Sequence, residues 1–386
     1  MDTQSVTGKK VLIVSARVGA GHGQVADALV GQLRLDAPDL CVEHLEVLEI
    51  LPKAFRLYYQ SGYVLSMTRF GRLYGLGFDI FNRPDRPGRA WHENARIIGE
   101  RFWMGPFIDR LINDQPDLIV NTHFLTTPVI DHIRRQGLLH CPQMVTITDY
   151  DPHRWWYAQG VDHWFVPSDD DRFKLARWGI DPHHTTVTTI PVHPKWTAPM
   201  DRHRILRDWK LPEDRPIVVL SGGAEFTCGP IEKIARRILA KCPPCLLIVL
   251  AGRNKELLGK LSALPETLKG DLRPVSFTDR VQELIFVASL MITKPGGVTT
   301  AECCAVGTPM ALLKPVPGQE VGNARYFSRK GAAVVANGNG DVANIACELL
   351  HDSEKLEQMS RAAESLHLPG TQMAARTILK RLATLD

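Results

Sequence analysis

Short apolar runs alternate with longer segments whose apolar positions recur every three or four residues, over roughly the first half of the chain. This alternation of strand-like and helix-like patterns predicts a parallel sheet with helices on both faces. A helix is expected at about residues 24–35, directly after the first strand. Strands are expected at residues 11–15, 117–122, 143–148, 162–166 and 186–190.

A proline-rich stretch without periodicity, residues 193–200, interrupts this pattern and predicts a linker. The alternation then restarts and predicts a second sheet of the same kind. We therefore expect an α/β fold of two Rossmann-like domains, residues 1–192 and 201–386, with a last helix that is a candidate to return to the first domain. The strands of the second sheet are expected at residues 217–221, 246–251, 273–277, 290–293, 310–313 and 333–335.

Composition narrows the class of protein. The 386 residues are 44% hydrophobic and 23% charged, which is normal for a globular protein. The net charge of +4 is too small to indicate a nucleic-acid partner. The apolar runs are far shorter than the roughly 20 residues that span a bilayer, and the N-terminus lacks the apolar core of a secretory signal. We expect a cytosolic protein that at most lies on a membrane.

A glycine cluster after the first predicted strand contains Gly21, His22 and Gly23. Glycines at this place let a ligand approach the backbone, and the following helix start favours negative charge. The spacing matches neither the dinucleotide-binding motif nor the P-loop, which disfavours both. An imidazole in such a turn can act as a general base near neutral pH, and the alternative is a histidine that caps or packs the turn.

Polar side chains end two further strands of the first domain, with His123 after one and Asp149 after the other. His153 and Trp155 follow a few residues later. Because the carboxyl ends of parallel strands meet at one edge of a sheet, we expect these groups to point into the cleft between the domains. Each of them alone could also be structural.

Glycine clusters also follow strands of the second domain, with Gly222 and Gly223 after one strand and Gly296 and Gly297 after another. Backbone N–H groups at the helix start after Gly296 suit a diphosphate without a metal ion. Glu302, about one turn into that helix, can accept both hydroxyls of a ribose. The alternative is a glutamate that only complements the helix dipole.

The loop after residues 310–313 carries Gln319, Glu320 and Asn323, whose side-chain types hydrogen-bond sugar hydroxyls. A solvated loop is the alternative. The phosphate turn has no Asp-x-Asp pair or other acidic cluster, so we expect neither a metal ion nor a cofactor.

Residues 52–72 contain Lys53, Arg56, Arg69 and Arg72 but no acidic residue, and aromatic and aliphatic residues lie between them. The pattern extends to about residue 90 and suits an anionic membrane surface. The alternative is an ordinary amphipathic helix that covers the sheet.

Four stretches together resemble the monogalactosyldiacylglycerol synthase and processive diacylglycerol glucosyltransferase family, which is related to the peptidoglycan N-acetylglucosaminyltransferase that makes lipid II. The resemblance covers about residues 11–375 and implies the GT-B fold, in which two Rossmann-like domains face each other across a cleft. The four stretches are residues 15–29, residues 148–153, residues 293–302 (TKPGGVTTAE) and residues 315–324 (PVPGQEVGNA).

The resemblance implies roles for single residues. Glu302 would hold the ribose, Phe277 and Thr278 would lie by the uracil, and His22 would be the general base, with Asp149 as the alternative. The implied donor-binding residues are Gly222, Gly223, Phe277, Thr278, Gly296, Gly297, Val298, Thr299, Glu302, Gln319, Glu320 and Asn323. The implied acceptor-binding residues are Gly21, Gly23, His123, His153 and Trp155.

The function expected on these grounds is inverting transfer of a hexose from a UDP-hexose to diacylglycerol or a related lipid, at the cytosolic face of a membrane. The sequence leaves open whether the donor is UDP-glucose or UDP-galactose, which lipid accepts the sugar and how many sugars are added. Two alternatives from other classes are a UDP-sugar 2-epimerase and a non-catalytic protein that binds a lipid or a nucleotide sugar.

Overall fold

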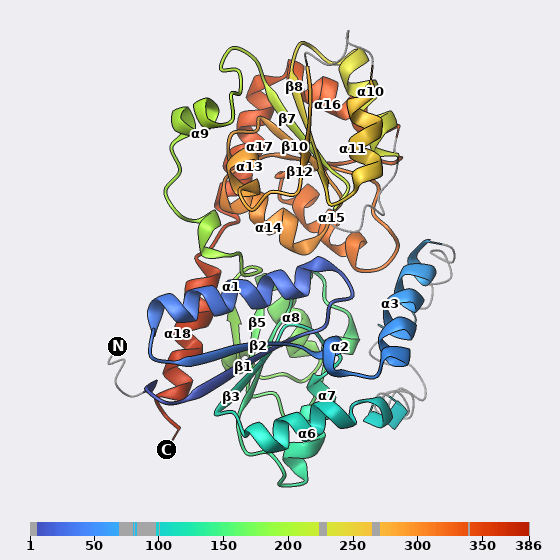
Figure 1. The fold of residues 1–386 in the computed structure, drawn as a ribbon. Coiled ribbons are helices and arrows are strands. Elements are labelled where there is room, and N and C mark those ends of the chain that lie inside the picture. Colours follow the sequence, from blue (N-terminus) through green and yellow to red (C-terminus); the bar gives the residue numbers. More distant parts are fainter. Residues whose placement is uncertain are drawn as a thin grey trace. The chain divides into compact units, whose positions relative to one another are not determined.

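The computed structural model describes residues 6–68, 80, 82, 98–99, 101–223, 230–264, 271–338 and 340–385. The chain forms two compact units, coloured along the sequence in Figure 1. Unit 1 comprises Met1–Pro194, Pro317–Gln319 and Leu368–Asp386, and unit 2 comprises Lys195–Val316 and Glu320–His367.

Unit 1 is built on a parallel six-stranded sheet with the strand order β2-β1-β3-β4-β5-β6. Its strands are β1 (Lys10–Ser15), β2 (Cys41–Glu46), β3 (Leu118–Asn121), β4 (Gln143–Thr146), β5 (His163–Val166) and β6 (Thr185–Val187). Its helices are α1 (Ala20–Asp36), α2 (Val47–Ile50), α3 (Lys53–Thr68), α6 (Gly105–Asp114), α7 (Thr127–Arg135), α8 (Asp169–Arg177) and α18 (Gly370–Leu382), with short 3-10 turns at Arg154–Trp156 and Pro182–His184.

Unit 2 repeats this architecture with the strand order β12-β11-β10-β7-β8-β9, again parallel throughout. Its strands are β7 (Ile217–Ser221), β8 (Leu246–Gly252), β9 (Leu272–Ser276), β10 (Leu290–Thr293), β11 (Met310–Leu312) and β12 (Ala333–Val335). Its helices are α9 (Arg202–Asp208), α10 (Ile231–Lys241), α11 (Lys255–Ser262), α13 (Val281–Phe286), α14 (Gly297–Ala305), α15 (Gln319–Arg329), α16 (Asp341–His351) and α17 (Ser353–Ser365), preceded by a 3-10 turn at Pro194–Trp196.

The central strands are apolar on both faces because helices cover each sheet from both sides. In β1, residues Val11 to Val14 have no exposed surface, and the same holds for Leu290 and Ile292 of β10. The predicted α/β fold with two Rossmann-like sheets is therefore confirmed. That the two domains face each other across a cleft stays a prediction.

Three expectations about local structure were wrong. Strand β2, at the edge of the sheet, was not predicted, because Glu43, His44 and Glu46 interrupt its apolar residues. Helix α1 begins at Ala20 rather than at residue 24, so His22 lies in its first turn and not in a loop. Likewise Gln319 and Glu320 lie in the first turn of α15 and not in a Pro/Gly loop.

The last helix, α18, packs on α1 and is attached to the segment that follows β6. Thr371 Oγ1 donates to the carbonyl of Val192 at 2.7 Å and accepts from its N–H at 3.1 Å. Gly370 fits against the backbone here, because a Cβ at this position would lie 1.6 Å from the carbonyl oxygen of Thr188. The start of α18 therefore depends on a residue without a side chain.

Replacing Gly370 by Ala should destabilise unit 1 by roughly 1–3 kcal/mol, because the backbone at residues 188–192 must move to admit the methyl group. The measurement is the free energy of unfolding in urea. Gly259→Ala serves as the matched control, since Gly259 lies in helix α11 with open space around it and should gain about 1 kcal/mol of helix propensity. Equal stability of the two variants would contradict the close packing at Gly370.

Candidate functional site

The first group of predicted site residues lies at the edge of the unit 1 sheet where the strands end. Helix α1 starts just after β1, with Gly19 as its N-cap residue in an extended conformation (φ −155°) and no side-chain hydrogen bond to the cap. The glycines around His22 therefore leave the first N–H groups of the helix uncovered by a capping side chain. His22 projects from this first turn toward the ends of β3 and β4.

Two groups lie within hydrogen-bonding distance of the same nitrogen of the His22 ring. Its Nδ1 lies 2.8 Å from the carbonyl oxygen of Thr122, just after β3, and 3.1 Å from Oγ1 of Thr148, just after β4. Because a carbonyl can only accept, Nδ1 must carry the proton, and the neutral ring then has its lone pair on Nε2. Thr122 Oγ1 also donates to the His22 carbonyl at 3.0 Å, which fixes the helix start.

Burial keeps the His22 ring neutral. The loss of water around the ring lowers its pKa from 6.5 to about 4, although the Thr122 carbonyl and the carboxylate of Glu46 both act to raise it. The residue as a whole is half-buried, so part of its surface remains in contact with solvent. A general base needs a neutral imidazole in which one nitrogen donates a hydrogen bond and the other has a lone pair that can accept a proton.

Aromatic rings surround His22. The His123 ring stands edge-on to it with centroids 4.4 Å apart, and the buried Trp156 lies 6.1 Å away. His123 in turn stacks on Phe124 at 4.2 Å. The structure thus brings together His22 and His123 as predicted, and adds Trp156 and Phe124 as residues that sequence reasoning did not select.

The remaining residues expected to bind the acceptor have structural partners of their own. His153 is buried, and its Nδ1 accepts from the N–H of Trp155 at 3.1 Å, which caps a 3-10 turn. The Trp155 indole lies 5.7 Å from the ring of Phe124. Asp149 is half-buried beside Thr148, whose hydroxyl contacts His22.

A polar network, buried at Ser15 and Glu46 and exposed at Asp27, links the ends of β1 and β2 to α1 and was missed in the sequence. The Glu46 carboxylate accepts from Ser15 Oγ at 2.6 Å and from the N–H of Arg17 at 2.8 Å. Ser15 also contacts His44 Nε2 at 2.8 Å, and His44 Nδ1 lies 2.8 Å from Asp27 of α1. Its only sequence signal was the unassigned strand β2, which supplies both Glu46 and His44.

The second group of predicted residues lies at the corresponding edge of the unit 2 sheet. Helix α14 starts after β10 with Gly296 as N-cap and Gly297 as its first residue, again without a capping side chain. Gly223, after β7, adopts φ +79°, and a Cβ there would lie 2.7 Å from Cε of Lys294. The uncovered N–H groups of a helix start next to an ammonium group suit a diphosphate.

Lys294 is a residue that the sequence reasoning did not single out. Its Nζ lies 3.2 Å from Oε1 of the buried Glu320, and the other oxygen of Glu320 accepts from the N–H of Val316 at 3.0 Å. The amide of Asn323, also buried, donates to the carbonyl of Pro295 at 3.0 Å. Glu320 and Asn323 therefore tie α15 to the turn before α14, which positions the turn.

Glu302 lies in α14 and is 9% exposed. Burial raises the pKa of its carboxyl group from 4.5 to about 8, while the Lys195 ammonium and a hydrogen bond with Trp196 act to lower it. The carboxyl group is thus mostly protonated at pH 7. A ligand whose hydroxyls donate to the carboxylate would favour the charged form and lower this pKa.

The other predicted donor residues show different degrees of exposure. Phe277, just after β9, is 62% exposed, and the guanidinium of Arg253 lies 4.6 Å from its ring centroid. Thr278 Oγ1 accepts from the N–H of Arg280 at 3.1 Å. Val298 is buried in α14, whereas Thr299 is half-buried. An exposed aromatic face at a strand end suits stacking with a flat base.

Two further properties concern the described part of the chain alone. Within it, no three His, Cys, Asp or Glu side chains are grouped so that they could hold a metal ion. No described helix combines the length and apolar character that crossing a membrane requires.

Comparisons with known proteins cover both units. The model of the monogalactosyldiacylglycerol (MGDG) synthase family matches residues 22–192, and that of the glycosyltransferase family 28 C-terminal domain matches residues 221–381. Among solved structures, S. aureus MnaA with UDP has a TM-score of 0.65 at 13% identity, covering 98% of each chain. Anabaena Alr3699/HepE with UDP-glucose has a TM-score of 0.54 at 14% identity, covering 97% of this chain and 98% of that one.

Curated relatives are similar along almost the whole sequence. The processive diacylglycerol beta-glucosyltransferase of Bacillus licheniformis is 32% identical over 367 residues, which cover 94% of this chain and 92% of the relative. The enzyme of the same name from Bacillus subtilis is 32% identical over 380 residues, covering 97% and 96%. The chain therefore belongs to the family of the processive diacylglycerol beta-glucosyltransferases.

Proposed function

We propose that this protein transfers a hexose from a UDP-hexose to the hydroxyl group of diacylglycerol or a closely related lipid and so makes a glycolipid. The observation that carries this proposal is the 32% identity with processive diacylglycerol beta-glucosyltransferases over 94% of the chain. The geometry supports it, because unit 1 holds a neutral base and unit 2 holds a helix start suited to a diphosphate.

The transfer is a single displacement with inversion at the anomeric carbon. The lipid hydroxyl oxygen forms a bond to that carbon while the bond from the carbon to the β-phosphate oxygen breaks. The hydroxyl proton passes to Nε2 of His22, and the bonding electron pair leaves with UDP. Nδ1 stays bonded to the Thr122 carbonyl, which keeps the ring oriented and stabilises the imidazolium that forms. Asp149 is the alternative base.

The donor is held by unit 2. The N–H groups at the start of α14 and the ammonium of Lys294 stabilise the charge that develops on the leaving UDP, so no metal ion is needed. Glu302 accepts the ribose hydroxyls, and Phe277 lies against the uracil. In this proposal Gly222 and Gly223 allow the diphosphate to approach the backbone, while Gln319 contacts the sugar.

The acceptor reaches His22 along a row of aromatic rings in unit 1. Tyr59 of α3 lies 6.3 Å from the His123 ring, and Phe55 lies 5.5 Å from Tyr59. Phe55 in turn lies 5.9 Å from Trp103, whose neighbour Phe102 is 81% exposed. The rings thus form a continuous path of aromatic contacts between the surface of unit 1 and His123, and in this proposal the lipid packs against its exposed end.

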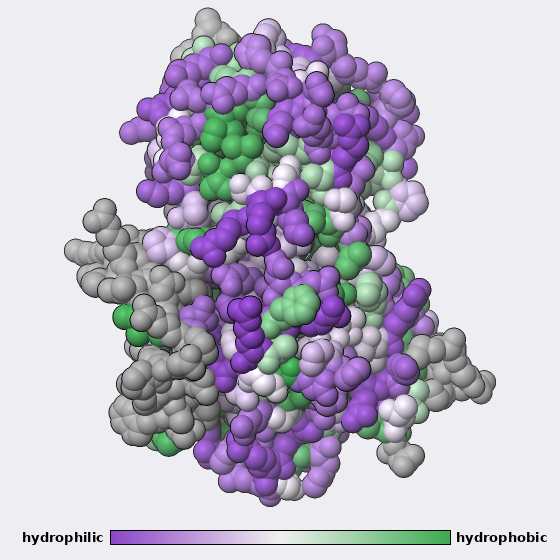
Figure 2. Space-filling model, turned by 180° about the vertical axis from the view of Figure 1, so that it is seen from behind, coloured by the Kyte–Doolittle hydropathy of each residue, from purple (hydrophilic) through white to green (hydrophobic). Residues whose placement is uncertain are grey.

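The surface at the outer end of this path has membrane-binding character. Helix α3 leaves Leu57 and Tyr58 exposed beside Lys53, and Ile98 and Phe102 are also exposed. Large apolar side chains that lie exposed next to one another, as Leu57 and Tyr58 do, suit a binding surface. On the face drawn in Figure 2, hydrophilic residues cover most of the described surface. We propose that this surface binds the cytosolic face of an anionic membrane. Arg69 and Arg72, which belong to the same predicted segment, lie outside the described residues.

The direct test incubates the purified protein with vesicles that contain diacylglycerol and either UDP-glucose or UDP-galactose. Mass spectrometry should find a hexosyl-diacylglycerol with one of the two donors. Reactions without lipid are the control, because a changed UDP-sugar in the absence of lipid would indicate a 2-epimerase instead. Absence of glycolipid with both donors would refute the proposal.

The first site prediction concerns Glu302. Because its carboxyl group is mostly protonated at pH 7 and ribose hydroxyls favour its charged form, UDP binding should release up to about one proton. Calorimetry in buffers of different ionisation enthalpy measures this release. In Glu302→Gln the release should vanish and the affinity should fall about tenfold, the effect of losing charge-assisted hydrogen bonds. An unchanged proton release in the variant would exclude Glu302 from the ribose site.

The second prediction concerns the base. His22→Ala should lower kcat by about 10²–10⁴-fold, the usual contribution of a general base, while UDP binding stays intact because its contacts lie in unit 2. Asp149→Asn is the comparison, and the double variant should lose no more than the larger single loss if the two residues act together. If Asp149→Asn abolishes turnover and His22→Ala costs less than about fivefold, Asp149 is the base.

The third prediction concerns the membrane surface. Changing Lys53 and Arg56 to Gln should weaken binding to anionic vesicles by about 1 kcal/mol per residue, measured by sedimentation with vesicles at low salt. The control changes Lys255 and Lys355, exposed lysines of unit 2, to Gln and should bind as the wild type does. Binding that is independent of salt and equal in both double variants would mean that α3 only covers the sheet.

A further inference from the structure

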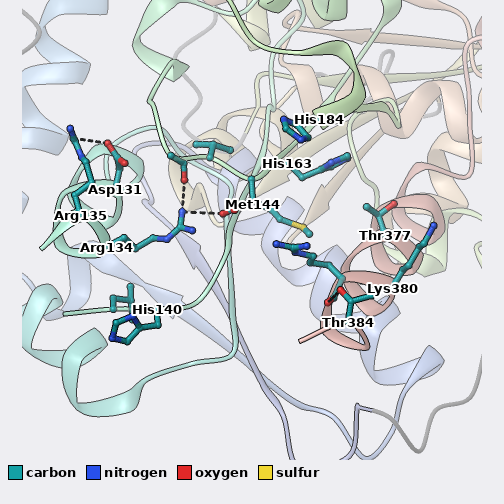
Figure 3. A pocket seen from close by; sticks show the side chains of 15 residues that line it. Asp131, Arg134, Arg135, His140, Met144, His163, His184, Thr377, Lys380 and Thr384 are labelled. Atoms are coloured by element: carbon teal, nitrogen blue, oxygen red, sulfur yellow. Dashed lines mark hydrogen bonds and ion pairs between the residues drawn. The ribbon is translucent and has the colours of Figure 1, made fainter. Parts of the chain in front are cut away.

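A cavity of about 780 Å³ lies in unit 1 at the edge of the sheet opposite to His22. It opens where strands β4 and β5 begin, and Met144 and His163 from these strands line it together with residues of α7 and α18 (Figure 3). Because ligands of parallel α/β sheets usually bind at the other edge, where the strands end, the fold alone does not account for this cavity.

The acidic side chains of the cavity are already neutralised. Arg134 lies 3.0 Å from Asp162. Arg135 lies 2.7 Å from Asp131, as the dashed line between them in Figure 3 shows. The two carboxylates therefore cannot offset further positive charge at this place, since each has its own guanidinium.

Two more cations enter from the last helix. Lys380 and Arg381 of α18 line the cavity, and neither forms an ion pair with any other residue that the structure describes. The hydroxyl-bearing side chains of Thr377, on the same helix, and of Thr384, two residues beyond its end, also line it. With two cations in excess of its carboxylates, the cavity has the charge of an anion site.

Two histidines complete the lining on the side of β5 and β6. His163 Nε2 lies 2.8 Å from Oγ1 of Thr186, and burial together with nearby His184 lowers the pKa of His163 to about 4. His163 is therefore mainly neutral at pH 7, and the positive charge of the cavity comes from its arginines and lysine.

We propose that this cavity binds a phosphate group, carried either by a soluble phosphate ester or by a phospholipid headgroup, at a site distinct from the diphosphate site of α14. Lys380 and Arg381 pair with the phosphate oxygens. Arginine and lysine are the side chains that proteins use for phosphate, and two of them from one helix turn can contact the same group. Binding joins α18 to the start of β5 and so stabilises unit 1.

The test measures binding of sn-glycerol 3-phosphate by calorimetry, with UDP present at saturation so that the donor site is occupied. Lys380→Gln and Arg381→Gln should each weaken binding at least about fivefold, since each removes one charged partner of the phosphate. Arg376→Gln is the matched control, because Arg376 is an exposed cation on the same helix that does not line the cavity. It should bind as the wild type does.

A second arm distinguishes the source of the phosphate. If glycerol 3-phosphate does not bind, sedimentation with vesicles of phosphatidylcholine and phosphatidylglycerol in equal parts should show weaker binding for Lys380→Gln and Arg381→Gln than for Arg376→Gln, which assigns the site to a lipid headgroup. If in both arms these variants behave like Arg376→Gln, the proposal is overturned.

Discussion

Parallel pairing of every strand brings all strand ends of a sheet to one edge, and both candidate sites of this chain depend on that constraint. In unit 1 the ends of β1, β3 and β4 deliver the start of α1, Thr122 and Thr148 to one place, although they are about a hundred residues apart in sequence. In unit 2 the ends of β7 and β10 do the same for Gly223 and Lys294. Neither group would form if one strand ran the other way.

Burial lowers the pKa of His22 and raises the pKa of Glu302, and the physical reason is the same for both. Low exposure to water disfavours the charged form of any group, so the pKa of His22 falls to about 4 and that of Glu302 rises to about 8. Both side chains are therefore mainly neutral at pH 7 before a substrate arrives. In the proposed reaction His22 would take a proton, and Glu302 would become charged when ribose hydroxyls replace the lost water.

Much of the fold and of the candidate sites could be predicted from the sequence. Strands that are buried on both faces appear as apolar runs, and glycines mark where the backbone must approach a ligand or another segment closely. The strands of unit 2 and the positions of Gly296 and Glu302 after strand β10 were predicted in this way. Edge strand β2 was missed because Glu43 and Glu46 lie on opposite faces of it, so neither face is apolar throughout. The sequence pattern predicted the start of helix α1 a few residues too late. Glycine has a low helix propensity but is tolerated in the first turn of a helix.

What could not be predicted are contacts between distant segments. The hydrogen bond that sets the tautomer of His22 joins residues 100 positions apart, and no local pattern signals it. The pairing of Lys294 with Glu320, a predicted sugar ligand, likewise joins the first turn of α15 to the turn before α14. Roles that depend on such contacts need the folded structure, because composition and spacing report only the residues nearby in sequence.

The central claim is that a neutral imidazole, protonated at Nδ1 and open at Nε2, stands where the acceptor hydroxyl must lose its proton. The most direct measurement is an NMR titration of the ¹⁵N-labelled histidines, with the His22 signals assigned by comparison with His22→Gln. The account predicts the Nδ1–H tautomer at pH 7 and protonation of His22 only near pH 4, far below the usual pKa of 6.5. Protonation of His22 near pH 6.5, or a proton on Nε2 in the neutral ring, would contradict it.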